Sequence, residues 1–219
     1  MINALIFDMD GVLLDSEPFW RKALREELAS LGVTLSEAEA AETMGIRIDQ
    51  VLEYRMKTHG WTGKTVPQVT ESILSRVIAE VEQRAVVLPG VWDCINKANR
   101  DGLKIGLATS SPSRLIDAVV KTLKMEDVFE VKKSAEFEQY GKPHPAIYLR
   151  TAEALGIAAP QCLAIEDSFN GLLSAKSAQM KCIAVPEDIS AHDPRFVIAD
   201  AKLDSLLDLD EALWFRLTK

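Results

Sequence analysis

Two aspartates follow the first apolar run of the sequence. Asp8 and Asp10 come directly after the run Ala4 to Phe7, and Gly11 follows them. Gly11 permits a sharp departure of the chain at this point, so the two carboxylates can take different roles. A D-x-D-G string alone is weakly specific, because a solvated acidic turn has the same composition. Its place at the end of a buried run favours a catalytic pair.

A second acid pair, Glu166 and Asp167, closes a later apolar run. Carboxylates that meet at one edge of a sheet repel one another and raise one another's pKa values unless a cation lies among them. Oxygen ligands without a nearby histidine or cysteine suit Mg²⁺. We therefore expect Mg²⁺ as the cofactor, with Asp8, Asp167 and the Asp10 carbonyl as ligands and Glu166 at the periphery.

A hydroxyl-rich segment and a lysine could bind an anion. Thr109, Ser110 and Ser111 follow another apolar run and precede a helix opened by Pro112, where exposed amides and the helix dipole favour negative charge. Lys142 lies between a glycine and a proline that favours extended backbone. Singly, these residues read as a helix-capping turn and a surface lysine. With the two acid pairs they form a set suited to metal-assisted phosphoryl transfer.

The elements that must position these residues alternate along the chain. Four short apolar runs read as strands buried on both faces: Ala4 to Phe7, Ile105 to Ala108, Cys162 to Ile165 and Cys182 to Val185. Segments of helical period separate them at 91–100, 114–124, 146–155 and 171–178, with a weaker strand at 128–131 and a closing helix at 203–217. This pattern predicts an α/β fold, a doubly wound (Rossmann-like) parallel sheet whose carboxyl ends gather the polar residues.

One long segment breaks the alternation. Residues 15–88 show only helical patterns, the first of them opened by Ser16 as a plausible N-cap, and the segment is too long for a single crossover. We expect a helical cap at 15–88, inserted into a core of 1–14 and 89–219; the alternative is that these helices cover one sheet face. Arg47 in this insert is a candidate contact for the remote part of a substrate, with a solvated surface arginine as the equal alternative.

Composition narrows the class of partner. The net charge is −8, from 33 acidic and 25 basic side chains, which disfavours nucleic acid and an anionic membrane surface. Three cysteines without a C-x-x-C pair argue against a disulfide framework or a zinc site and favour a reducing cytoplasm. The N-terminus reads as neither a signal peptide nor a membrane span. We expect a cytoplasmic monomer, completed by its own cap, that acts on a small-molecule phosphate ester.

With these residues in hand, the chain resembles the haloacid dehalogenase-like superfamily of aspartate-nucleophile phosphohydrolases, in the branch whose helical cap follows strand one. All four motifs of that family have counterparts: FDMDG at 7–11, ATSSP at 108–112, GKPHP at 141–145 and IEDSFNG at 165–171. The resemblance implies that Asp8 is the nucleophile and Asp10 the general acid and base. It also implies that Thr109, Ser110 and Lys142 bind the phosphate. Ser111, just past Thr109 and Ser110, is a candidate contact for the sugar.

Further segments are similar to the bacterial hexitol phosphatase and 2-deoxyglucose-6-phosphate phosphatase group: VLLDSEPFW, GIRID at 45–49 and DPRFV at 193–197. This similarity implies sugar phosphates or sugar-alcohol phosphates as substrates. Asp10 disfavours halide chemistry, and Trp20 stands where similar β-phosphoglucomutases carry a histidine. A mutase and a phosphoglycolate phosphatase remain enzymatic alternatives. A phospho-aspartate signalling or scaffold protein is the non-enzymatic one, although a D-x-D-G on strand one and a long insert speak against a receiver domain.

Overall fold

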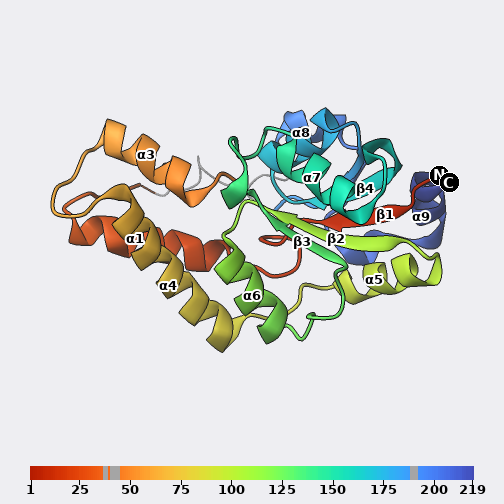
Figure 1. Ribbon diagram of the computed structural model, residues 1–219, viewed down its shortest axis with the longest axis horizontal. Coiled ribbons are helices and arrows are strands. Elements are labelled where there is room, and N and C mark those ends of the chain that lie inside the picture. Colours follow the sequence, from red (N-terminus) through yellow and green to blue (C-terminus); the bar gives the residue numbers. More distant parts are fainter. Residues whose placement is uncertain (37–38, 40–44, 188–191) are drawn as a thin grey trace.

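Six parallel strands form one sheet in the computed structural model, which describes residues 1–36, 39, 45–187 and 192–219 (Figure 1). Their order across the sheet is β3-β2-β1-β4-β5-β6. The strands are β1 (Ala4–Phe7), β2 (Lys104–Thr109), β3 (Val131–Ser134), β4 (Cys162–Glu166), β5 (Lys181–Ala184) and β6 (Ala201–Lys202). This order confirms the predicted α/β class with a doubly wound, Rossmann-like sheet.

Helices cover both faces of the sheet. They are α5 (Val91–Arg100), α6 (Ser113–Thr122), α7 (Ala146–Leu155), α8 (Phe169–Ser177) and α9 (Glu211–Thr218), with short 3-10 turns η1 (Ala135–Phe137), η2 (Ala159–Gln161), η3 (Pro194–Ile198) and η4 (Leu206–Asp208). Alternate side chains of β1 point to opposite faces: Leu5 and Phe7 join the apolar cluster that contains α5 and α6, whereas Ala4 and Ile6 join the one that contains α7 and α8. Burial on both faces explains why β1 is apolar throughout.

The helices α1 (Glu17–Ser30), α3 (Ile48–Thr58) and α4 (Val66–Arg84) lie beyond the carboxyl ends of the strands (Figure 1). α1 and α4 pack against each other, and α4 begins at a capping box formed by Thr65 and Gln68. The chain enters and leaves this helical insert at neighbouring points, because the Leu88 amide donates a hydrogen bond of 2.9 Å to the Leu13 carbonyl. The domain boundaries at 15 and 88 stay a prediction.

Two predicted elements lie at other residues than expected, and the short strand β6 was not predicted. β3 begins at Val131, where the predicted strand 128–131 ends. The predicted closing helix at 203–217 is shorter: η4 precedes α9, and the Asp210 carboxylate accepts the Leu213 amide at the N-cap of α9.

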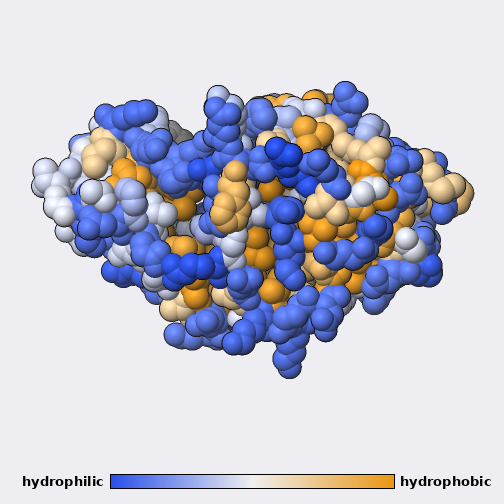
Figure 2. Space-filling model, viewed as in Figure 1, coloured by the Kyte–Doolittle hydropathy of each residue, from blue (hydrophilic) through white to orange (hydrophobic). Residues whose placement is uncertain are grey.

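Figure 2 shows hydrophilic side chains over most of the visible face, with hydrophobic ones between them. None of the helices in the described part of the chain combines the length and the apolarity that a membrane span requires.

Candidate active site

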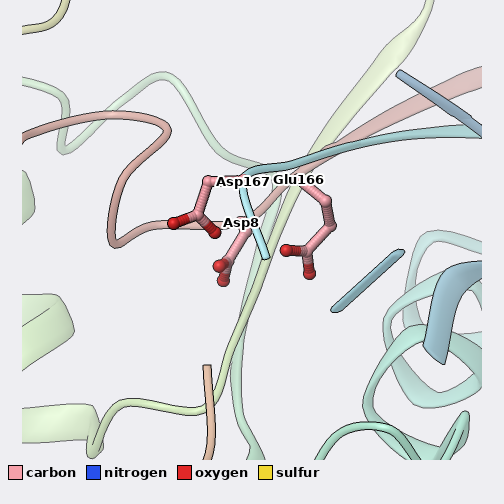
Figure 3. Close-up of side chains that lie close together, drawn as sticks. All are labelled: Asp8, Glu166 and Asp167. Atoms are coloured by element: carbon pink, nitrogen blue, oxygen red, sulfur yellow. The ribbon is translucent and has the colours of Figure 1, made fainter. Parts of the chain in front are cut away.

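Three carboxylates meet where the central strands β1 and β4 end (Figure 3). Asp8 follows β1, Glu166 is the last residue of β4, and Asp167 comes next. Each offers a carboxylate oxygen within 4.8 Å of the others. All three residues are buried, with 5% or less of each exposed. The two acid pairs of the sequence therefore contribute three groups to one cluster.

Lys142 is the cation of this cluster. Its Nζ lies 2.8 Å from Asp8 Oδ1 and 2.7 Å from Glu166 Oε1, and it also donates to the Ala108 carbonyl. Burial alone would lower the pKa of Lys142, but the Asp8 and Glu166 carboxylates raise it above its ordinary value. The Tyr148 hydroxyl also donates to Glu166 Oε1. Glu166 is thus well placed to hold Lys142 beside Asp8.

The single positive charge of Lys142 does not balance the three carboxylates of this cluster. Burial, and next the Glu166 carboxylate, raise the pKa of Asp8; burial, and next Asp8, raise that of Asp167. A buried set of carboxylate oxygens with surplus charge fits a hard divalent cation such as Mg²⁺. Gly11 gives Asp167 room, since a Cβ there would lie 2.1 Å from Asp167 Oδ2, and its φ of +70° favours glycine.

These shifts predict how the stability of the metal-free protein depends on pH. Folded Asp8 has a pKa above its ordinary value of 3.8, so the folded state binds more protons than the unfolded state in the interval between the two values. The contribution of Asp8 to the free energy of unfolding should therefore fall as the pH rises through that interval. Urea titrations of the parent protein and of Asp8→Asn, with a chelator present and at several pH values, isolate this contribution, and the free energy of the parent relative to that of the variant should decrease with pH. A difference that increases with pH over the interval would contradict the assignment.

The Asp10 carboxylate is held by hydrogen-bond donors. Ser16 Oγ and Trp20 Nε1 donate to its Oδ1, the latter over 3.0 Å, while Ser111 Oγ donates to Oδ2 over 2.7 Å and Thr109 Oγ1 over 3.4 Å. This role of Ser16 and Trp20 was not predicted from the sequence. Ser16 does occupy the N-cap position of α1, but its hydroxyl makes no capping hydrogen bond and instead binds Asp10. Only its closeness to Asp10 along the chain could have signalled this.

A cavity of about 80 Å³ opens above these groups. From the sheet edge it is lined by Asp8, Asp10, Thr109, Ser110, Ser111 and Asp167, and from the helical insert by Glu17, Trp20, Arg21, Leu24, Gly45, Ile46, Ile48 and Val51. The predicted phosphate-binding hydroxyls thus share one cavity with the acid pairs. Glu17 is a further candidate that the sequence analysis missed: burial, then Glu187 and Asp10, raise its pKa to about 7.

Arg47, the predicted contact for the remote part of a substrate, uses its guanidinium within the protein. It is not among the residues that line the cavity. Its guanidinium instead donates to the Ala135 and Glu138 carbonyls and pairs with Asp49. With 14% of its side chain exposed, it is not a solvated surface arginine either. The geometry thus supports neither of the two interpretations of Arg47.

Comparison with known proteins adds to this geometry. Residues 2–179 match the family of haloacid dehalogenase-like hydrolases. The chain is 42% identical to hexitol phosphatase B of Escherichia coli (strain K12), covering 95% of this chain and 94% of that protein. It is 30% identical to the phosphorylated carbohydrates phosphatase of Thermotoga maritima, covering 83% and 84%. CbbY from Rhodobacter sphaeroides, solved in complex with phosphate, superposes with a TM-score of 0.88 at 27% identity, covering 95% and 96%.

Proposed function

Because this chain belongs to the haloacid dehalogenase-like hydrolase family, we propose that it is a phosphoric monoester hydrolase that acts on sugar phosphates or sugar-alcohol phosphates. The names of its relatives, hexitol phosphatase B and phosphorylated carbohydrates phosphatase, support this substrate class. One observation carries the reaction: the buried Asp8 carboxylate lies 2.8 Å from Lys142 and faces the cavity under the insert.

In this mechanism, Asp8 attacks phosphorus in line and forms an acyl phosphate as the bond to the alcohol oxygen breaks. Protonated Asp10 gives its proton to the departing oxygen, and then takes one from the water that cleaves the acyl phosphate. Lys142, Thr109 and the Ser110 amide would bind the phosphoryl oxygens. Asp8, Asp167 and the Asp10 carbonyl would hold Mg²⁺, with Glu166 outside them; the bound ion supplies neutralisation of phosphoryl charge.

The donors around Asp10 fix its position. Ser16, Trp20 and Ser111 all donate to the carboxylate, so its two oxygens are held at the wall of the cavity. A carboxyl group fixed there can meet the leaving oxygen in the first step and the attacking water in the second.

Asp10→Asn is expected to lower turnover of a sugar-alcohol phosphate by about 10²-fold or more, because the leaving alkoxide loses its proton donor. The loss should be smaller for p-nitrophenyl phosphate, whose leaving group needs little protonation. Phosphate release from both substrates measures the difference. Asp15→Asn, a nearby exposed aspartate, serves as the control. Equal losses on both substrates would argue against a role as general acid.

A phosphate-release screen tests the proposed function. Sugar phosphates, sugar-alcohol phosphates, phosphoglycolate and nucleotides are each incubated with the enzyme in Mg²⁺ and again with a chelator. We expect the highest kcat/KM on the first two classes and loss of activity with the chelator. An isomerised hexose phosphate without released phosphate would indicate a mutase instead. A phosphorylated protein that persists without turnover would indicate a signalling role.

A further inference from the structure

Arg47 joins the helical insert to the segment that leads to Lys142. It is the N-cap residue of α3, and its Nη1 donates to the Ala135 carbonyl over 2.9 Å and to the Glu138 carbonyl over 2.7 Å. Both carbonyls belong to η1 and its end, only a few residues before Lys142. The Asp49 carboxylate accepts from Nε and Nη2 of the same guanidinium. One arginine thus connects the insert to the catalytic lysine's own loop.

The backbone around Lys142 also packs on Arg47. A Cβ at Gly141 would lie 3.0 Å from Arg47 Cδ and 2.9 Å from Gln50 Oε1, so this position leaves almost no room for a side chain. Close by, Ser110 Oγ donates over 3.0 Å to the Gly45 carbonyl. The start of α3 and the residues just before it therefore contact both the segment before Lys142 and the hydroxyl segment after β2.

The guanidinium has little capacity left for a substrate. Arginine carries five N–H donors. Two are taken by the main-chain carbonyls of Ala135 and Glu138, and Nε and Nη2 each use one on Asp49. A bidentate contact with a second phosphate, or with sugar hydroxyls, would require these hydrogen bonds to break. The observed contacts favour a structural link across the site over recognition of the ligand.

We propose that Arg47 is a positioning residue: it fixes the segment from Ala135 to Gly141, and with it Lys142, when the insert is seated over the cavity. This inference rests on the proposed function for the role of Lys142. Lys142 is held at its far end by Asp8 and Glu166 and, through its loop, by Arg47. The phosphate site is then complete only with the start of α3 in place.

Arg47→Ala and Arg47→Lys test this role against substrate recognition. We expect both variants to lose kcat by roughly 10- to 100-fold, the scale on which a misplaced catalytic group acts. The factor should be the same for a sugar-alcohol phosphate and for p-nitrophenyl phosphate, which has no sugar hydroxyls. The matched control is Arg114→Ala, which breaks the exposed pair of α6 with Glu71 on α4 and should leave kcat unchanged.

Hydrogen exchange gives a readout that does not depend on turnover. In Arg47→Ala the amides of residues 135–141 should exchange faster than in the parent protein, whereas Arg114→Ala should leave them unchanged. A loss confined to the sugar-alcohol phosphate, with unchanged exchange, would overturn the proposal and assign Arg47 to the substrate. If the parent protein released no phosphate from any ester, the proposed function would fail, and exchange would still decide whether Arg47 orders this segment. Arg47→Lys keeps the charge, so its exchange and kcat still test the proposal if the alanine variant does not fold.

Discussion

Replacing Asp8 by asparagine is expected to abolish phosphate release and leave the fold intact. The amide cannot attack phosphorus, and removing a nucleophile from a catalytic set costs on the order of 10⁵-fold or more. Asparagine has the same shape as aspartate but carries no charge. Burial and Glu166 raise the pKa of Asp8, so the charged form of this residue destabilises the folded protein. The thermal stability of Asp8→Asn should therefore equal or exceed that of the parent protein when no metal is present.

Two measurements check this expectation. Phosphate release is followed with the best substrate of the screen, and acid-quenched protein is analysed for the mass of a bound phosphoryl group. The parent protein should carry that group during turnover, and Asp8→Asn should not. Comparable turnover by both proteins would show that Asp8 is not the nucleophile.

Lys142→Met should remove both activity and stability. The side chain of Lys142 is 1% exposed and lies between Asp8 and Glu166, so its loss leaves buried carboxylates without their cation. Breaking a buried pair on one side costs about 3–5 kcal/mol. Urea unfolding measures the difference. Lys22→Met is the control, since the pair of Lys22 with Glu80 has the same 2.7 Å separation as that of Lys142 with Glu166 but is exposed to solvent, so its loss should change the free energy of unfolding little.

A double variant separates the two roles of Lys142. Lys142→Met combined with Glu166→Gln removes one of the stranded charges together with the cation, and should recover much of the lost free energy of unfolding. Activity should stay lost, because the phosphoryl oxygens still lack the lysine. A double variant as unstable as the single one would show that Lys142 stabilises the protein through packing and not through charge.

The sheet could be predicted because its centre is buried on both faces. Burial makes β1 and β4 continuous apolar runs, and their parallel pairing brings the residues after them to one edge. The position of β3 could not be predicted from the same signal. Phe129 lies before that strand and packs edge-on against Phe7, while Lys132 and Lys133 within the edge strand are exposed. At this edge of the sheet the apolar residues therefore lie before the strand and not within it, so an apolar run does not mark the strand's position.

The acid cluster and its lysine could be predicted because the residues that follow parallel strands gather at one edge of an α/β sheet. The partners of Arg47 left no such signal, because main-chain carbonyls are present at every residue and their direction depends on the folded chain. The indole of Trp20 is similar: its apolar ring predicts packing, and only the turn after β1 brings its N–H to Asp10. Contacts that depend on the path of the folded backbone could therefore not be predicted from the sequence.

The hydrogen bond between the Leu88 amide and the Leu13 carbonyl has a consequence for the origin of the insert. The points where the chain enters and leaves the insert are adjacent, so a short turn could replace the whole insert without altering the path of the strands. A gene could therefore gain, lose or exchange this segment in one recombination step. A replacement segment would also have to supply the hydrogen bonds that Ser16 and Trp20 give to Asp10, and those that Arg47 gives to the segment before Lys142.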